Sequence, residues 1–337
     1  MTETFKNIKE IRDLSDSRVL AAVQAENTPV VFRGLAENWP LIERARTSSA
    51  AASDYLLKFY AGEPVTTFTA APSAAGRISY TDNLAEKNFK QKREPLDNVL
   101  RRLLENENDP DAPTIYVGSR SLDQYLPGLR EENSLPLHDV RPTVRIWIGN
   151  RTTVAAHYDT LENIACVCAG RRRFTLFPPD QLPNLYIGPI DFTPAGQSIS
   201  LVDLKDPDFD KYPRFAEALK HAQAAELEPG DAIYIPAMWW HAVEGLEEFN
   251  VLINHWWRDV PDFMGAPGDA LLHAILSIRE LPKEQRNAWQ AFFNHYVFEA
   301  SDETAGHIPA ARRGPLGDLD DELARRLRAV LRNNLNR

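Results

Sequence analysis

The chain has 337 residues and a net charge of −10, with 38 lysines and arginines against 48 aspartates and glutamates. This length fits one large domain or two ordinary ones, and an apolar fraction of 43% is typical of a globular protein with a sizeable core. A fold held by disulfides is excluded, because the only cysteines, Cys166 and Cys168, are too close in sequence to join distant segments.

Charge and hydropathy also limit the partners and the compartment. No stretch approaches the roughly 18 consecutive apolar residues of a membrane span, and residues 1–10 lack the apolar segment of a secretory signal. The acidic balance argues against binding to nucleic acid or to an anionic membrane surface. We therefore expect a cytoplasmic protein with neither kind of partner.

The N-terminal part of the chain predicts short helices and strands in alternation. One or two helices are expected within residues 8–26, where apolar residues recur among charges. A β-branched run that ends at a glycine predicts a strand over 28–34, and another strand is expected over 65–70. Helices are expected over 54–60 and over 95–106, the second with leucines on one face.

Beyond residue 112 the pattern changes to short strands at close spacing. Turns rich in glycine and proline separate candidate strands at 114–117, 143–148, 164–168, 174–177, 233–235 and 250–256. Many short strands between such turns are typical of a sandwich or barrel. We expect the barrel core to occupy about 112–258.

Three helices are predicted after residue 261, over 270–279, 284–298 and 320–335. The last has an acidic start, which suits the helix dipole, and a stripe of leucine and valine along one side. Such a stripe exceeds what a barrel needs for cover. We therefore predict that these helices join two copies in a homodimer, although packing on their own barrel is the alternative.

The sequence His157-Tyr158-Asp159 stands just after a strand and turn, at the start of the next candidate strand. In an extended chain, residues i and i+2 share a face, so His157 and Asp159 can point at one place. A histidine and a carboxylate are two of the three ligands of the facial triad that binds Fe(II) and leaves positions open. A third ligand is expected from a distant strand, and His241 ends a turn, strand and corner segment over 229–241.

Each part of this pattern has an ordinary explanation when taken alone. A His-x-Asp sequence is common in surface turns, and a histidine after two tryptophans is more often packed in a core than bound to metal. The two segments support each other because both lie in the strand-rich region, at the ends of expected strands. We therefore predict a metal site formed by His157, Asp159 and His241.

Several segments resemble the JmjC/cupin-like 2-oxoglutarate-dependent oxygenases, with most similarity to the asparaginyl hydroxylases among them. The resemblance is carried by HYDTLENIACVCAGRRRFTLFPPD from residue 157, PGDAIYIPAMWWHAVE from residue 229, and NVLINHWW from residue 250. Weaker matches are TPVVFRGLAENWP from residue 28 and DPDFDKYPRF from residue 206. The similarity covers about 28–258 and is densest over 145–258.

This resemblance implies a mainly β fold with α elements. It implies a double-stranded β-helix (jelly-roll, cupin) core, with N-terminal α/β elements and C-terminal helices. The catalytic domain is then expected over 1–260 and the helical, dimer-forming region over 261–337.

The resemblance also implies cofactors and the residues that hold them. Fe(II) is expected on His157, Asp159 and His241, with 2-oxoglutarate as cosubstrate and O2 as oxidant. The remaining positions are expected to surround the cosubstrate. Asn163 and Asn254 match amides near the metal and the C1 carboxylate, Trp256 matches an aromatic wall, and Tyr116 matches a phenol at the C5 carboxylate.

Two positions depart from the family pattern. Arg172 stands where the asparaginyl hydroxylase used for comparison has a lysine that pairs with the C5 carboxylate of 2-oxoglutarate. Arginine can bind the same group with two parallel hydrogen bonds. Val154 stands where that hydroxylase has a threonine, and Thr153, one residue earlier, could replace it through a local change of register. Strand alternation predicts that Arg172 points inward and that Arg171 and Arg173 point outward, although a solvated hairpin edge is the alternative.

The sequence also allows predictions for three further features. Cys166 and Cys168 are expected to be ordinary core thiols. Trp256 should share a face with Asn254. Arg145 and Trp147 share a face too, which could be the mouth of the pocket or a side covered by helices.

The resemblance implies hydroxylation of a protein or peptide side chain. A basic residue that contacts substrate is expected just before Gln197, but the chain has Gly196 there, so a different substrate is expected. The alternatives are a small molecule or natural-product peptide as substrate, and a non-catalytic cupin that only binds or regulates. The intact metal triad argues against the non-catalytic alternative.

Overall fold

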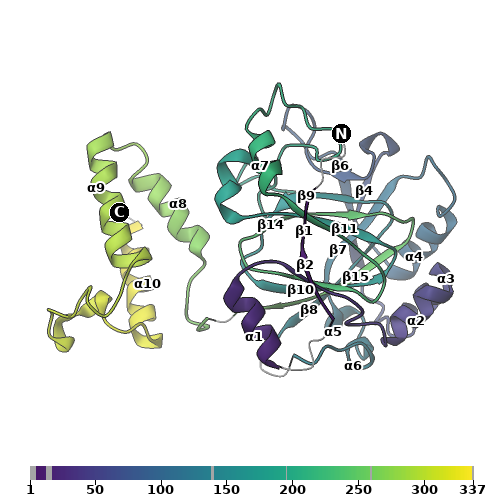
Figure 1. The fold of residues 1–337 in the computed structure, drawn as a ribbon, viewed down its shortest axis with the longest axis horizontal. Helices are drawn as coiled ribbons and strands as arrows, with labels where there is room; N and C mark the ends of the chain where they lie inside the picture. The colour runs from purple at the N-terminus through teal and green to yellow at the C-terminus, as the bar shows by residue number, and fades with distance from the viewer. Residues whose placement is uncertain (1–4, 13–16, 138–139, 195, 259, 336–337) are drawn as a thin grey trace. The chain divides into compact units, whose positions relative to one another are not determined.

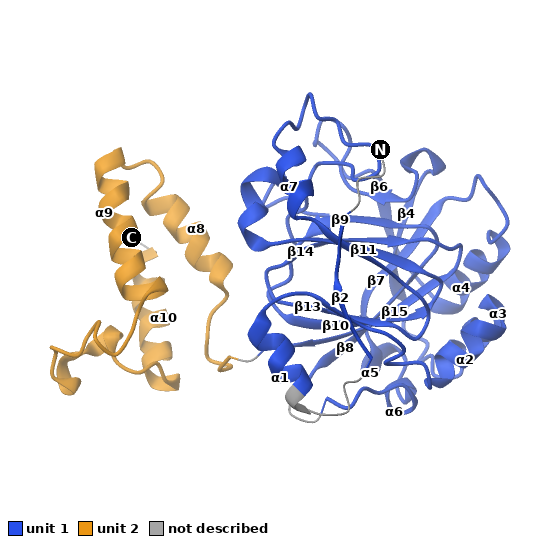
Figure 2. Cartoon of the chain, viewed as in Figure 1, with its two compact units in different colours: residues 1–258 blue, residues 259–337 orange. Residues whose placement is uncertain are grey.

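In the computed structural model, the residues described are 5–12, 17–137, 140–194, 196–258 and 260–335. The chain divides into two compact units, residues 1–258 and residues 259–337 (Figure 2). Each unit is described by itself below.

The N-terminal elements of the first unit alternate as the sequence predicts, but their bounds differ. They are β1 (Lys6–Asn7), β2 (Lys9–Ile11), α1 (Ser17–Glu26), β3 (Val30–Phe32), α2 (Pro40–Thr47), α3 (Ser49–Leu57), β4 (Val65–Ala70), β5 (Arg77–Ile78), β6 (Phe89–Glu94) and α4 (Leu96–Glu105). The helix predicted from residue 8 is wrong over its first part, because Lys9–Ile11 pairs with β3 as a parallel strand. The helix predicted from residue 54 begins earlier, where the Ser48 side chain caps it by accepting a hydrogen bond from the Ala51 N–H.

The rest of the first unit is built almost entirely of strands. Its helices and strands, in chain order, are β7 (Thr114–Ser121), α5 (Leu122–Tyr125), α6 (Leu129–Glu132), β8 (Thr143–Gly149), β9 (Thr153–His157), β10 (Glu162–Ala169), β11 (Arg172–Phe177), α7 (Phe215–His221), β12 (Gln223–Leu227), β13 (Ala232–Ile235), β14 (Trp240–Gly245) and β15 (Asn250–Trp257). All six strands predicted in this region are present.

These strands form two sheets, which Figure 1 shows one above the other. The larger sheet has the order β2-β3-β13-β10-β15-β8-β7-β4-β6, and the smaller has the order β1-β12-β11-β14-β9-β5. From β8 to β15, successive strands mostly alternate between the two sheets. This alternation is the winding of a double-stranded β-helix, so the predicted fold class is confirmed.

Apolar side chains fill both faces of the larger sheet. The inner face packs against the smaller sheet: Ala165 and Val167 of the larger sheet share a core cluster with Phe174 of the smaller sheet. The outer face carries Cys166 and Cys168, which are buried free thiols among the apolar residues of α2, α3 and α4. Strand alternation therefore separates residues that face the interior of the barrel from residues that hold its helical cover.

The second unit consists of α8 (Pro267–Ser277), α9 (Lys283–Phe293), a π-helical turn at Asn294–Phe298 and α10 (Asp321–Leu335). The three predicted helices are present. In the described part of this unit, only Ala305, Leu323 and Ala324 are buried, and many large apolar side chains are exposed. Across the described ranges of the whole chain, no helix combines the length and apolarity needed to cross a membrane.

Candidate active site

The three predicted ligands lie together at one end of the barrel. His157 ends β9, Asp159 follows it by two residues, and His241 is the second residue of β14, directly opposite His157 in the strand register. One ligand atom of each residue lies within 4.8 Å of the others, and Nε2 of His241 is 3.6 Å from Oδ2 of Asp159. The expectation that His157 begins a strand is wrong, since it closes one.

A β-bulge in β9 sets the direction of His157. His157 pairs with His241 and Val154 pairs with Val243, so β9 has one residue more than β14 between these two pairs. An extra residue in one strand turns the side chains beyond it. Val154 and His157 can therefore face the interior together, although they are three residues apart.

The two imidazoles present the same nitrogen to the site. Nδ1 of His157 lies 2.9 Å from the Ala155 carbonyl oxygen, and Nδ1 of His241 lies 3.0 Å from the Trp239 carbonyl oxygen. With Nδ1–H donating to a carbonyl, the lone pair on Nε2 is left for a metal. Burial, and then the neighbouring His157, lower the pKa of His241, which favours the neutral imidazole that binds metal.

A cavity of about 620 Å³ opens beside these ligands. His157, Asp159, Tyr116 and Trp256 are among its lining residues, and Asp159 is the one carboxylate among the described residues that line it. The predicted residues Arg172, Asn163, Asn254 and His241 are buried without belonging to this lining.

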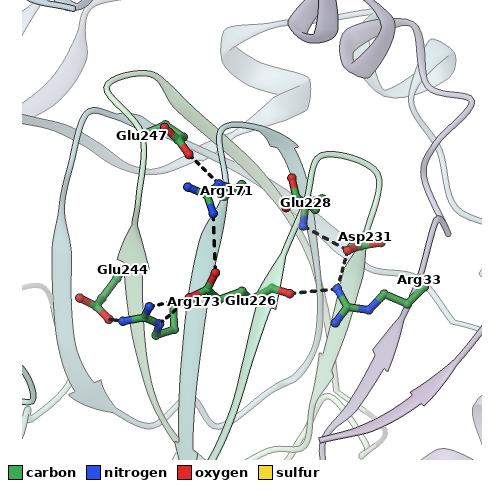
Figure 3. Close-up of polar contacts among 8 residues, drawn as sticks. All are labelled: Arg33, Arg171, Arg173, Glu226, Glu228, Asp231, Glu244 and Glu247. Carbon is green, nitrogen blue, oxygen red and sulfur yellow. Dashed lines mark hydrogen bonds and ion pairs between the residues drawn. The ribbon is translucent and has the colours of Figure 1, made fainter. Parts of the chain in front are cut away.

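Arg172 points between the two sheets, as strand alternation predicts. Its side chain is 2% exposed, and its Nε and Nη2 have no hydrogen-bond partner among the described residues. Its neighbours lie on the outer face, where Arg171 bonds Glu247 and Arg173 bonds Glu226 (Figure 3). A buried guanidinium with unused donors is costly unless an anion completes it.

Tyr116 is one of the titratable groups on which the charge of Arg172 acts. Burial raises the pKa of Tyr116, and the Arg172 guanidinium partly offsets that rise. Burial likewise lowers the pKa of Arg172. Gly149 makes room for the phenol, because a Cβ there would lie 2.7 Å from the Ile115 carbonyl oxygen and 3.1 Å from the Tyr116 ring.

The register of β9 corrects the assignment of Thr153. Thr153 pairs with Glu244, whose side chain forms ion pairs with Arg173 and Lys205 on the outer face, so Thr153 lies on that face too. Val154 is the residue that lines the cavity. The bulge comes after Val154, so it does not bring the Thr153 hydroxyl into the pocket.

The two predicted amides are in direct contact on the inner face. Nδ2 of Asn254 donates to Oδ1 of Asn163 at 2.7 Å, and Oδ1 of Asn254 has no hydrogen-bond partner within the described residues. Trp256 follows on the same face and meets Trp147 edge-on, with ring centroids 5.9 Å apart. His255 is buried on the opposite face, beside Trp39.

The sequence did not predict some of the residues that line the cavity, and it left the orientation of Arg145 and Trp147 undecided. Trp147 lines the cavity, which places the face that it shares with Arg145 on the inside of the barrel. Lys87 and Arg120 also line the cavity and were not predicted. Strand alternation places Gly118 on the same face as Tyr116, and it lines the cavity too, but no local pattern marks Lys87 or Arg120.

The donor set has a definite chemical meaning. Two imidazole nitrogens and one carboxylate oxygen on adjoining strand ends suit a divalent ion such as Fe(II), with positions left open for other ligands. The partnerless guanidinium of Arg172 suits a carboxylate, and the phenol of Tyr116 can donate to the same group. The residues present therefore fit both an iron ion and a dicarboxylate.

Comparison with known proteins gives several related sequences. Lysine-specific demethylase JMJ31 of Arabidopsis thaliana is 34% identical over 117 residues, which is 34% of this chain and 21% of that protein. The tRNA wybutosine-synthesizing protein 5 of Gallus gallus is 34% identical over 146 residues, 39% of this chain and 43% of that protein. The protein of the same name from Mus musculus is 24% identical over 324 residues, 85% of this chain and 94% of that protein.

The chain thus spans less than half of the plant and chicken relatives, but nearly all of the mouse relative. A family model described as the cupin-like domain matches residues 16–263. This match covers well over half of the chain and includes both strands that carry the triad. The chain therefore belongs to the cupin-like domain family.

Proposed function

We propose that this protein is an Fe(II)- and 2-oxoglutarate-dependent oxygenase that hydroxylates a protein or peptide side chain. One observation carries the proposal: His157, Asp159 and His241 converge beside a cavity, while two nitrogens of the buried Arg172 guanidinium have no hydrogen-bond partner among the described residues. Bound there with 2-oxoglutarate and O2, iron would supply the oxidising power to insert an oxygen atom into a C–H bond.

The chain's own residues bind and position the reactants. His157, Asp159 and His241 would hold the ion from one side and leave the other side open to the cavity. Arg172 and Tyr116 would fix the far carboxylate of 2-oxoglutarate, and the apolar Val154 next to them offers no competing hydrogen bond. Asn254 has an unused amide oxygen, and Trp256 forms part of the cavity wall. The aromatic and aliphatic side chains of the walls would limit the access of water to the reacting carbon.

The cavity lining favours an anionic group on the substrate. Lys87 and Arg120 line the cavity, and neither forms an ion pair with any carboxylate in the described ranges. Lys87 instead lies 5.6 Å from the centre of the Phe192 ring, and Arg120 donates to the Gly118 carbonyl oxygen at 2.7 Å. An acidic peptide side chain would meet both cations. The particular resemblance to asparaginyl hydroxylases remains a prediction. A small molecule or a natural-product peptide remains the alternative substrate.

A second candidate substrate is a modified nucleotide of tRNA. The mouse relative, which this chain covers almost completely, is named for the synthesis of the tRNA base wybutosine. The same cations would then contact phosphate. The net charge of −10 weighs against a large nucleic-acid surface, so we place this candidate second.

The test is O2-dependent release of succinate from 2-oxoglutarate in the presence of Fe(II), with acidic peptides and bulk tRNA as separate substrates. We expect turnover that a peptide stimulates, and a mass gain of one oxygen atom on that peptide. His157→Ala should abolish turnover and Mn(II) binding without unfolding the protein. Stimulation by tRNA alone would replace the first candidate with the second, and absence of both turnover and metal binding would indicate a non-catalytic cupin.

A further inference from the structure

The corner between β13 and β14, residues 236–239, contains backbone that its sequence does not explain. Met238 has a φ of 69°, in the left-handed region that costs free energy for any residue with a Cβ. Its side chain is 46% exposed, so packing of the methionine does not account for this conformation. The reason must be sought in what the backbone of the corner contacts.

That backbone forms hydrogen bonds with two of the three proposed metal ligands, Asp159 and His241. The Met238 N–H donates to the Asp159 carbonyl oxygen at 2.7 Å, and the Trp239 carbonyl accepts from Nδ1 of His241 at 3.0 Å. Asp159, which follows β9, and His241, in β14, are far apart in the sequence. The corner therefore fixes the main chain at one ligand and the ring of the other through the backbone of two adjacent residues.

The corner is in turn tied to the N-terminal segment. Nε1 of Trp239 donates to the Asn27 carbonyl oxygen at 3.1 Å, and the indole is 5% exposed. Asn27 itself is left-handed, with a φ of 49°, and its N–H donates to the Gln24 carbonyl at the end of α1. Asparagine is one of the few residues that readily ends a helix in this way, so the acceptor for Trp239 is held firmly.

We propose that the Met238–Trp239 corner is a positioning device that sets the metal affinity of the site, and that the Asn27–Trp239 hydrogen bond couples α1 to it. This inference rests on the proposed role of the triad as a metal centre. Groups that orient metal ligands typically change metal affinity by about 10- to 100-fold when removed. The corner's contribution should therefore be measurable apart from catalysis.

The chain offers a matched pair of tryptophans for the test. Trp39 is 6% exposed and donates its indole N–H to the Ser134 carbonyl at 3.0 Å, so its burial and hydrogen bond resemble those of Trp239. It packs in the cluster on the outer face of the larger sheet, whereas Trp239 packs in the cluster between the sheets. Replacing either residue with phenylalanine removes one buried indole hydrogen bond and keeps an aromatic ring.

The measurement is the Kd for Mn(II), obtained by anaerobic calorimetry on the full chain, with Tm of the metal-free protein alongside. Trp239→Phe and Trp39→Phe should lower Tm to a similar degree. Trp239→Phe should weaken Mn(II) binding by about tenfold, whereas Trp39→Phe should leave the Kd unchanged. Equal Kd values for the two variants at equal Tm would overturn the inference.

Substitutions of Met238 provide an independent test of the same inference. Met238→Gly keeps the N–H and accepts the left-handed backbone, so Mn(II) affinity should stay at the parent level. Met238→Pro loses the N–H and fixes φ near −65°, so affinity should fall by about tenfold or more, with a changed absorption spectrum of the Co(II) form. A proline variant that folds and binds like the parent would contradict the role of the corner. A parent protein that binds no Mn(II) would instead overturn the metal centre itself.

Discussion

At the scale of single residues, Arg172 is the side chain whose surroundings are most incomplete. Two of its nitrogens have no partner in the described structure, although the residue is almost fully buried. Burial disfavours its charged form, which is seen in the lowered pKa. A bound carboxylate would satisfy the donors and the charge at the same time.

We therefore predict that Arg172→Gln weakens 2-oxoglutarate binding to the Mn(II)-loaded protein by about 10- to 100-fold, because hydrogen bonds to charged groups contribute roughly 1.5–3 kcal/mol. Arg172→Lys should retain part of the affinity, since it keeps the charge but loses the bidentate geometry. Calorimetric titration with 2-oxoglutarate measures both. If the glutamine variant binds like the parent, Arg172 is not the anchor.

His255 provides a prediction about pH. Burial, followed by the nearby Arg130, lowers the pKa of His255 to about 3. An unfolded chain protonates this imidazole near pH 6.5, so below that pH the unfolded state takes up a proton that the folded state does not. Stability from this residue is therefore complete above about pH 6.5 and falls as the pH is lowered toward 3. At about pH 5.5 the loss amounts to roughly 1.4 kcal/mol.

The variant His255→Leu removes this titration. Its free energy of unfolding should fall less than that of the parent between about pH 7 and pH 5.5, by roughly 1 kcal/mol. Denaturant titrations at the two pH values measure the difference. Parallel losses in parent and variant would show that His255 does not contribute. The triad histidines are present in both proteins and cancel in the comparison.

Strand alternation predicted the inward direction of Arg172 and the shared face of Asn254 and Trp256 from sequence alone. The same rule could not place Thr153, because the hydrogen-bond register that fixes its face is not visible in the sequence. The bulge that turns His157 inward was equally hidden, since Ala155 and Ala156 are compatible with regular strand or bulge. Register depends on the partner strand, which lies far away in the chain.

At the scale of elements, a network of charged residues joins strands across the outer face of the first unit (Figure 3). Arg33, just after β3, donates to Asp231 at 2.6 Å and to the Glu226 carbonyl at 2.9 Å. Asp231 also accepts from the backbone N–H groups of Gly34 and Glu228. Hydrogen bonds from Arg33 and Gly34 to Asp231 therefore attach the N-terminal segment to the turn before β13.

We predict that Arg33→Gln lowers the free energy of unfolding by about 1–2 kcal/mol, because its partner Asp231 is largely buried and the hydrogen bonds are charge-assisted. Arg171→Gln is the matched control. Arg171 bonds Glu247 on the same face but is exposed to solvent, so its removal should leave stability unchanged within error. Equal effects of the two substitutions in denaturant titrations would contradict a stabilising role of the Arg33–Asp231 interaction.

Strands that are rich in β-branched and aromatic residues were predictable as elements, whereas several others were not. The missed strands include β2 and β6 of the larger sheet and all strands of the smaller sheet except β11. The sequence of β12, QAAEL, has no β-branched residue and reads as helical by propensity. Pairing with β11 decides its structure, which is a tertiary effect that local sequence cannot report.

At the scale of the whole molecule, the second unit carries much more exposed apolar surface than a free-standing unit should. Leu272, Leu276, Phe292 and Phe298 are all exposed, while its described part buries only three side chains. So small a core cannot offset the entropy of ordering the helices. A large exposed apolar surface marks an interface, and we propose that its partner is the same unit of a second copy.

The prediction is a homodimer that depends on the last helix. Removal of residues 318–337 should give a monomer or insoluble protein, because α10 supplies the stripe of Val330, Leu331 and Leu335. Light scattering of the full chain and the truncated chain measures this. A full chain that is monomeric, or a truncated chain that is still dimeric, would contradict the proposal.

The position of the triad has a consequence for folding as well as for chemistry. His157 and His241 lie on neighbouring strands of one sheet, but a long stretch of chain separates them in sequence. A bound ion would act as a reversible cross-link that closes this loop, as a disulfide does in proteins that have one. This chain has no distant cysteines for such a bond. Its resistance to unfolding should therefore rise and fall with metal supply, so that metal-starved protein should be more easily degraded.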